Sequence, residues 1–147
     1  MERGGRVRTG IVADVTARTL RDALRENVDP AKSTLYTDEL TSYRRVGKEF
    51  VGGHHTTKHS KHEYARGDAH SNTVEGFFSI VKRGLNGIYH AVSKEHLHRY
   101  LCEFEFRYNH RHMDDGDRTC AAIKASEGKR LTYENSKASQ EAYGTDA

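Results

Sequence analysis

Cysteine and proline are scarce in this sequence of 147 residues, tryptophan is absent, and there is no long hydrophobic run. The two cysteines, Cys102 and Cys120, are too few and too far apart for a disulfide framework or a zinc knuckle. We therefore expect both to be buried thiols in a reducing cytoplasm. No stretch approaches the ~18 apolar residues needed to span a bilayer, and the first residues lack the apolar centre of a signal peptide.

The balance of apolar and charged residues is typical of one folded domain with a modest core. Hydrophobic residues make up 35% of the chain and charged residues 31%, which is too apolar a composition for a wholly disordered chain. The formal net charge is +3, and ten histidines add positive charge below neutral pH. This basic balance is compatible with a polyanionic partner.

The hydrophobic pattern predicts alternating strands and helices. The expected elements are a turn at Arg3–Arg6, a strand at 7–15, a helix from Thr16 to Asp29-Pro30, strands at 33–37 and 54–59, a loop at 59–69, helices from Asn72 and from Ser93, a loop at Asp114–Asp117 and a short helix at 119–125. The helix from Asn72 has its apolar side at Val74, Phe77, Phe78, Val81 and Leu85. This order predicts an α/β domain with at least one crossover between parallel strands.

Asp38 directly follows the expected strand at 33–37. Ligands of α/β proteins bind at the carboxyl edge of the sheet, which is where this carboxylate is expected to lie. Aspartate also commonly caps a turn, here the turn into residues 39–41. The spacing alone leaves both interpretations open, a functional carboxylate and a turn cap.

Glu75 lies in the first turn of the helix expected from Asn72. Asn72 and Glu75 have the spacing of a capping box, in which the glutamate accepts from the backbone N–H of the cap residue. A carboxylate in this turn also faces the edge of the sheet, where it and Asp38 together could bind Mg²⁺. Two such ions suit phosphoryl transfer, because one activates the attacking oxygen and the other stabilises the leaving oxygen.

Basic side chains follow these carboxylates along the chain. Lys82 comes two helical turns after Glu75, so both project from one face, where the lysine either contacts a DNA phosphate or is simply solvated. Arg83 and His90 add donors and ring surface suited to a nucleic-acid strand. The histidines are too irregularly spaced for a zinc site; those nearest one another are His54, His55, His59, His62 and His70.

A charged row is expected on the helix from Ser93. Glu103 and Arg107 are four residues apart, and Arg111 continues the row one turn later. Such a pair on an exposed face forms a salt bridge that contributes a few tenths of a kcal/mol.

Short motifs occur in a fixed order along the chain. They are Thr37-Asp38-Glu39 with Tyr43, His59-Ser60 with Glu63-Tyr64, His70-Ser71-Asn72-Thr73-Val74-Glu75-Gly76-Phe77-Phe78, Lys82-Arg83-Gly84, Gly87-Ile88-Tyr89-His90, His96-Leu97-His98-Arg99-Tyr100, Glu103-Phe104-Glu105-Phe106-Arg107-Tyr108-Asn109 and Gly128-Lys129-Arg130-Leu131-Thr132-Tyr133. This ordered set closely resembles the DDE-type insertion-sequence transposases of bacteria, in the ISXO-like group. The likeness runs from about Arg6 to Tyr133.

The resemblance implies a ribonuclease-H-like (retroviral-integrase-like) mixed sheet with flanking helices, and cutting and joining of DNA with Mg²⁺ or Mn²⁺. Asp38 matches the second catalytic aspartate and Glu75 the third catalytic residue, with Asn72 as the reserve candidate. Lys82 matches a basic residue that contacts DNA. The side chains expected to bind DNA are Lys82, Arg83, His90, Arg107 and Arg111. The implied partners are the transposon ends, the target DNA and a second transposase molecule, in a cytoplasmic, nucleoid-associated protein.

The sequence departs from the family pattern in two places. The first catalytic aspartate has no counterpart, so we expect residues 1–133 to form a catalytic domain that is incomplete at its N-terminus, and residues 134–147 to form a flexible tail. An arginine expected after Arg107 is replaced by His110, beside Arg111. The leading hypothesis is therefore a transposase remnant that is catalytically incomplete. The alternatives are a non-catalytic DNA-binding or dimerising module that modulates an intact transposase, and a general Mg²⁺ nuclease.

Overall fold

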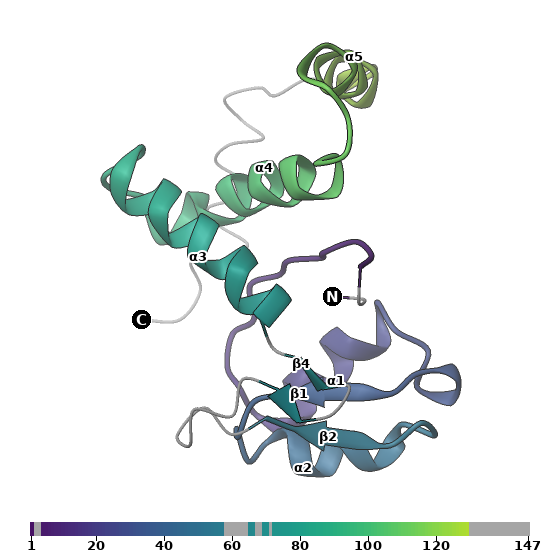
Figure 1. Ribbon diagram of the computed structural model, residues 1–147. Helices are drawn as coiled ribbons and strands as arrows, with labels where there is room; N and C mark the ends of the chain where they lie inside the picture. The colour runs from purple at the N-terminus through teal and green to yellow at the C-terminus, as the bar shows by residue number, and fades with distance from the viewer. Residues whose placement is uncertain (2–3, 58–64, 67–68, 71, 130–147) are drawn as a thin grey trace. The chain divides into compact units, whose positions relative to one another are not determined.

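The computed structural model describes residues 1, 4–57, 65–66, 69–70 and 72–129 (Figure 1). The chain forms two compact units, one comprising Gly10–Ile80 and the other Met1–Thr9 with Val81–Ala147. Helices are combined with a small parallel sheet, which confirms the predicted α/β class. Across the part of the chain that the structure describes, every helix is too short or too polar to cross a membrane.

The unit formed by Gly10–Ile80 contains both two-stranded sheets. Its elements are α1 (Ala17–Arg25), η1 (Pro30–Lys32), β1 (Leu35–Thr37), α2 (Tyr43–Val46), η2 (Gly47–Glu49), β2 (His54–Thr56), β3 (Ala65–Arg66), β4 (Ala69–His70) and the first part of α3 (Asn72–Gly87). Strands β1 and β2 pair in parallel, with Leu35 opposite His54, and β3 pairs with β4 in the antiparallel direction. The parallel pair confirms the predicted crossover.

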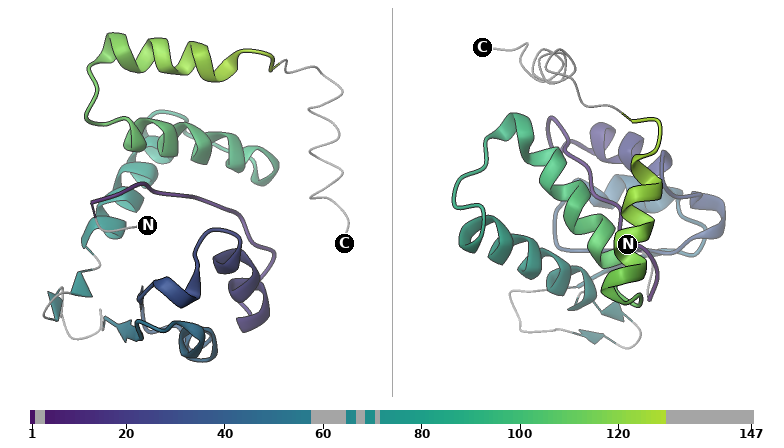
Figure 2. Two further views of the ribbon diagram at one scale, coloured as in Figure 1. Left: turned by 90° about the vertical axis from the view of Figure 1, so that its right-hand side faces the viewer. Right: turned by 90° about the horizontal axis from the view of Figure 1, so that it is seen from above.

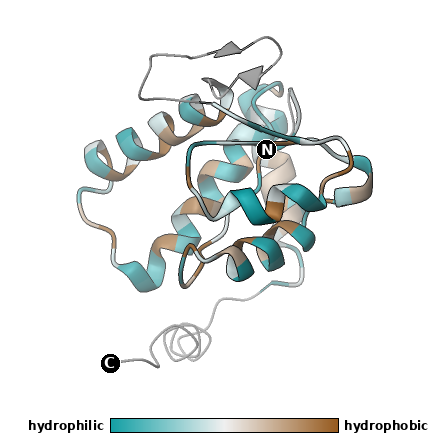
Figure 3. Cartoon of the chain, turned by 90° about the horizontal axis from the view of Figure 1, so that it is seen from below, coloured by the Kyte–Doolittle hydropathy of each residue, from teal (hydrophilic) through white to brown (hydrophobic). Residues whose placement is uncertain are grey.

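The core of this unit packs α1 and α2 against β1. Its buried side chains are Leu20, Leu35, Val46 and Phe50, with Ala17, Leu24, Val28 and Tyr43 packed around them. Outside the core, Glu49 accepts hydrogen bonds from Arg21 at 2.5 Å and from Arg25 at 2.9 Å, so one carboxylate joins η2 to two turns of α1. Figure 3 shows hydrophilic and hydrophobic residues alternating along the helices, as expected for helices with one apolar face.

Helix α1 starts where the sequence predicts and ends earlier. Thr16 caps it, because its Oγ1 accepts a hydrogen bond from the backbone N–H of Thr19 at 3.4 Å. The helix ends at Arg25, rather than at Asp29-Pro30. Those two residues open η1 instead, with Asp29 accepting from the backbone N–H of Ala31 at 3.0 Å.

The predicted strand at residues 7–15 is wrong, since that segment carries no strand pairing. Its backbone is bound by side chains of α4 (Leu97–Asn109). The Asn109 amide accepts from the N–H of Val7 at 2.8 Å and donates to its carbonyl at 2.9 Å, while Glu105 accepts from the N–H of Thr9 at 2.7 Å. These side chains replace a neighbouring strand, and Figure 2 shows the N-terminal segment running beside α4. The turn before it is confirmed, with Gly4 at φ +66°.

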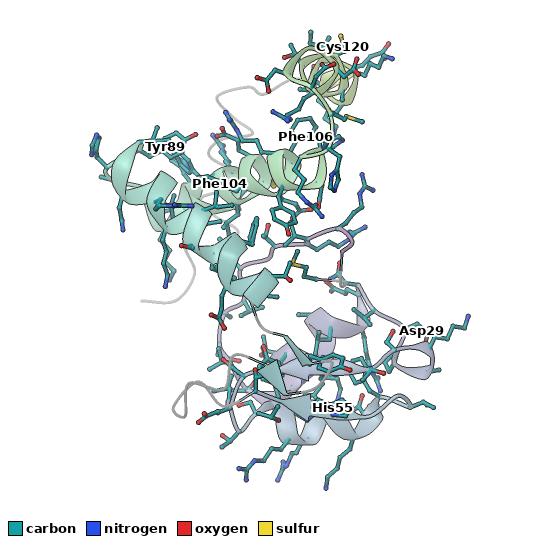
Figure 4. The ribbon with its side chains drawn as sticks, in the orientation of Figure 1. Asp29, His55, Tyr89, Phe104, Phe106 and Cys120 are labelled. Atoms are coloured by element: carbon teal, nitrogen blue, oxygen red, sulfur yellow. The ribbon has the colours of Figure 1, made fainter. Side chains whose placement is uncertain are left out.

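Beyond its N-terminal segment, the second unit carries only helices as regular elements in its described part. It comprises the end of α3, η4 (Lys94–His96), α4 and α5 (Asp115–Ser126). Gly84 of α3 lies against the Phe104 ring of α4 so closely that a Cβ at this glycine would be 2.2 Å from the ring Cζ. The ring of Tyr89 also packs edge-on to Phe104, at 6.4 Å between centroids (Figure 4). Val74 and Phe78, predicted on the apolar side of α3, are exposed, whereas Phe77 and Val81 are buried as predicted.

Three further sequence predictions are wrong in the described residues. The loop expected at Asp114–Asp117 is the start of α5, because Asp114 caps the helix by accepting from the N–H of Asp117 at 2.8 Å. Cys102 and Cys120 are exposed, not buried. Strands β3 and β4 interrupt the loop expected at 59–69, most of which lies outside the described residues together with the tail from 134.

Candidate active site

Asp38 lies directly after β1, at the carboxyl end of a parallel strand, and is exposed. Its Oδ1 accepts a hydrogen bond from the backbone N–H of Leu40 at 3.2 Å, which closes the turn after the strand. The turn-capping interpretation of Asp38 is therefore confirmed. An ionised carboxylate has further lone pairs on both oxygens, so the cap leaves it able to bind a cation. The catalytic and metal-binding roles of Asp38 stay predictions.

Thr37, the last residue of β1, connects the strand ends beside Asp38. Its Oγ1 donates to the carbonyl of Asp38 at 3.0 Å and lies 2.8 Å from Nε2 of His54 on β2. Because the hydroxyl has one proton, which Asp38 accepts, Nε2–H of His54 is the donor in the second contact. Thr57 donates its N–H and its Oγ1 to the carbonyl of Thr37, at 3.0 and 3.2 Å. The strand end that precedes Asp38 is thus bound by side-chain and backbone groups of β2 and of Thr57, the residue after it.

The ring of His54 is packed against η2. A Cβ at Gly47 would lie 2.3 Å from Nδ1 of His54, so only glycine leaves room for the ring there. Burial of the ring, and the nearby His55, lower the pKa of His54 below its ordinary value. Sequence reasoning missed this role, because the parallel register that pairs His54 with Leu35 leaves no local signal.

Tyr43, the first residue of α2, responds to the charge of Asp38. Burial raises the pKa of the Tyr43 phenol, and the negative charge of Asp38 raises it further. Among the described residues, no lysine or arginine forms an ion pair with Asp38. Within the described residues, the Asp38 carboxylate thus has the Tyr43 phenol near it and no ion-pair partner.

Glu75 lies in the first turn of α3 and is half-buried. Asn72 is the first residue of the same helix, in agreement with the predicted start. The capping pair expected between them lies outside the described side chains, as do residues 58–64 between β2 and α3. Within the described ranges, no three His, Cys, Asp or Glu side chains gather into a metal-binding cluster. The approach of Asp38 to Glu75 and the catalytic roles of Glu75 and Asn72 therefore stay predictions.

The predicted DNA-contacting side chains at the end of α3 are exposed. Lys82 and Arg83 both lie on solvent-accessible positions of the helix, and the Lys82 position is two turns beyond Glu75. His90 follows the helix in the left-handed conformation, with φ +56°, which histidine adopts more readily than most side chains. Their exposure leaves these three residues accessible to a ligand, and their DNA-binding roles stay predictions.

The predicted salt bridge on α4 is confirmed. Both Nε and Nη2 of Arg107 lie 2.9 Å from Oε1 of Glu103. The other carboxylate oxygen of Glu103 accepts from the Tyr89 hydroxyl at 2.5 Å, and this hydrogen bond raises the pKa of Tyr89. Glu103 of α4 therefore binds Tyr89, in the segment after α3, as well as pairing with Arg107.

Arg111 is engaged within the chain. Its Nη1 donates to the carbonyl of Tyr108 at 2.9 Å, its guanidinium lies 4.2 Å above the Tyr108 ring, and its Nη2 donates to the carbonyl of Gly4 at 3.4 Å. The contact with Gly4 joins the N-terminal segment to the end of α4, and the two contacts with Tyr108 fix the Arg111 side chain. The DNA-binding roles of Arg107 and Arg111 stay predictions.

The fold is that of an α/β protein with a carboxylate, Asp38, directly after a parallel strand. Comparison with known families identifies the family within this broad class. The family described as the ISXO2-like transposase domain matches residues 1–109. The chain therefore belongs to this family of insertion-sequence transposases, and its role lies in transposition.

Two curated relatives agree with this assignment. An "uncharacterized transposase-like protein" of Haemophilus influenzae is 35% identical over 105 residues, which cover 71% of this chain and 81% of the relative. An "uncharacterized protein in transposable element ISH50" of Halobacterium salinarum is 34% identical over 74 residues, which cover 50% of this chain and 25% of that protein. No solved structure matches the chain.

Proposed function

We propose that this chain supplies two carboxylates, Asp38 and Glu75, to metal-dependent phosphoryl transfer at insertion-sequence ends. The observation that carries the proposal is the position of Asp38, exposed directly after a parallel strand and without an ion pair to any cation of the described residues. The strand–helix–strand unit β1–α2–β2, with its parallel pairing, supports a ribonuclease-H-like sheet. Membership of a transposase family supports the reaction class.

The donor set fits a hard divalent cation. Asp38 and Glu75 are oxygen donors, as Mg²⁺ and Mn²⁺ prefer, and the hydrogen bond from Leu40 leaves lone pairs of the Asp38 carboxylate available. Mg²⁺ takes few protein ligands and keeps the rest for water and phosphate oxygens, so a pair of carboxylates suits it better than a closed cage of side chains. Bound there, the ion supplies Lewis-acid stabilisation of charge on phosphate oxygens.

Other residues of the chain hold the Asp38 strand end or offer cations to DNA. The hydrogen bonds among Thr37, His54 and Thr57 fix the end of β1, and so they restrict the backbone position of Asp38. Lys82 and Arg83 are exposed cations for the phosphates of the strand that is cut. A third carboxylate, matching the first catalytic aspartate of the resemblance, has to come from outside these 147 residues.

Metal binding tests the proposal without requiring turnover. Free Mn²⁺ is measured by electron paramagnetic resonance during titration of the full chain and of the Asp38→Asn and Glu75→Gln variants. Both substitutions are expected to weaken Mn²⁺ binding at least tenfold, because each removes one anionic ligand. The matched control is Asp22→Asn, an exposed carboxylate on α1, which is expected to bind as the unmodified chain does. Equal binding by the control and both site variants would contradict the proposal.

Strand cleavage separates this proposal from a non-catalytic role. Element-end DNA is incubated with Mn²⁺ and the chain, alone and with a longer protein of the family that carries its own first aspartate. Cleavage that needs Asp38 supports the phosphoryl-transfer role. DNA binding that persists in the Asp38→Asn and Glu75→Gln variants, with no cleavage under either condition, would instead support a DNA-binding module.

A further inference from the structure

A second group of cations lies on α2 and η2. Arg44, Arg45 and Lys48 are all exposed. At 3.6 residues per turn in α2 and about 3 in η2, their positions fall within an arc of about 100° on the helix surface. Val46 and Gly47, on the opposite side, are buried. The segment therefore presents three positive charges on one face, which we call the α2 basic face.

The acidic residue nearest to this face in sequence does not neutralise it. Glu49 is bound by Arg21 at 2.5 Å and by Arg25 at 2.9 Å, both from α1. Within the described part of the chain, none of Arg44, Arg45 and Lys48 forms an ion pair. Three like charges within one and a half turns repel one another, so the folded chain bears an electrostatic cost that an anionic ligand would remove.

The α2 basic face is carried by a well-anchored backbone. Val46 is 1% exposed and Phe50 is 6% exposed, and both belong to the core shared with α1 and β1. The two arginines and the lysine thus project from a fixed surface, and less conformational freedom is lost on binding than for cations on a loop.

We propose that the α2 basic face binds the phosphate backbone of DNA, as a contact additional to that of α3. From Arg44 to Lys48 the two helical segments rise about 6–8 Å, and each strand of duplex DNA carries one negative charge per ~3.4 Å of the axis, so this span faces about two phosphates of one strand. The planar guanidinium of arginine can donate two parallel hydrogen bonds to one phosphate, which favours phosphate as the ligand of Arg44 and Arg45. The contact is independent of base sequence. It rests on the DNA-binding part of the proposed function and not on the metal site.

The test measures the salt dependence of DNA binding by the full chain. Fluorescence anisotropy with a short labelled duplex of arbitrary sequence gives the affinity over a range of NaCl concentrations. The triple variant Arg44→Gln, Arg45→Gln and Lys48→Gln is expected to reduce the slope of log K against log[NaCl] by about 2, since each phosphate contact contributes about 0.9. Its affinity at low salt is expected to fall by about tenfold or more.

A matched control removes the same charge elsewhere. The triple variant Lys94→Gln, Lys124→Gln and Lys129→Gln also lowers the net charge by three, at exposed positions of the other unit. Its slope is expected to stay within about 1 of that of the unmodified chain. Equal losses in the two triple variants would overturn the proposal, because net charge alone would then explain the binding. Absence of DNA binding by the unmodified chain at low salt would overturn it as well.

Two further measurements keep the outcome interpretable. If the far-UV circular dichroism of the first triple variant shows loss of helix, the single variant Arg45→Gln takes its place, with an expected slope decrease of about 1. The Asp38→Asn variant separates this proposal from the metal site: it is expected to lose Mn²⁺ binding and to keep the full salt slope. A slope unchanged in Arg45→Gln and in the triple variant would show that the α2 basic face does not contact DNA.

Discussion

Replacing Gly84 by alanine tests the contact between α3 and α4. A Cβ at Gly84 would lie 2.2 Å from Cζ and 2.7 Å from Cε1 of Phe104, whose side chain is buried. The ring is rigid, so either it or the helix has to shift. Overpacking of this kind costs about 1–3 kcal/mol, whereas replacing glycine by alanine within a helix gains about 0.8–1.0 kcal/mol from helix propensity. The expected net change is a loss of about 0–2 kcal/mol in the free energy of unfolding.

Gly76→Ala in the same helix is the matched control. No atom lies within 4 Å of a Cβ added there, so this variant is expected to gain up to about 1 kcal/mol. The difference between the two variants, about 1–3 kcal/mol, therefore isolates the steric effect. Urea unfolding followed by far-UV circular dichroism measures it, because the chain has no tryptophan to report by fluorescence. Equal stabilities of the two alanine variants would refute the close packing of Gly84 on Phe104, whereas partial recovery by adding Phe104→Leu would support it.

Two other predictions concern polar contacts. Burial alone would raise the pKa of Glu49, but the hydrogen bonds and charges of Arg21 and Arg25 keep this pKa below the ordinary 4.5. The ionised carboxylate therefore stabilises the fold above pH 4.5, and this stabilisation is lost as the pH falls through the lowered pKa. Unfolding midpoints of Glu49→Gln are expected to fall less steeply from pH 5 downward than those of the unmodified chain. Asn109→Ala leaves the backbone N–H and carbonyl of Val7 without their side-chain partners. This variant is expected to lose about 1–3 kcal/mol in the free energy of unfolding and to show faster hydrogen exchange of the Val7 amide. Unchanged exchange would contradict the contact.

Local signals in the sequence were sufficient for several elements. The cap at Thr16, the strand before Asp38 and the start of α3 at Asn72 all follow from side-chain chemistry or periodicity within a few residues. The parallel pairing of β1 with β2 follows from the order of elements. The position of Asp38 at a strand end could therefore be predicted, because it depends on one strand and the residue after it.

Other features depend on contacts between residues far apart in sequence. Residues 7–15 have an alternating pattern, yet Asn109 and Glu105 bind the backbone of this segment, and a local window contains neither. The same limit applies to the role of His54, which depends on the strand register. At Asp114 the error was local instead, since a run of acidic residues and glycine is compatible both with a loop and with a capped first turn.

The binding of the N-terminal segment by α4 has a consequence for synthesis on the ribosome. Val7 and Asn109 are 102 positions apart, so at about 5–20 residues per second the amide of Val7 is made roughly 5–20 s before its partner. Before Asn109 is made, all residues of the core of Leu20, Leu35, Val46 and Phe50 have been synthesised. The order of translation thus favours the unit that carries Asp38 folding first, with the helical unit completed only when the end of α4 emerges.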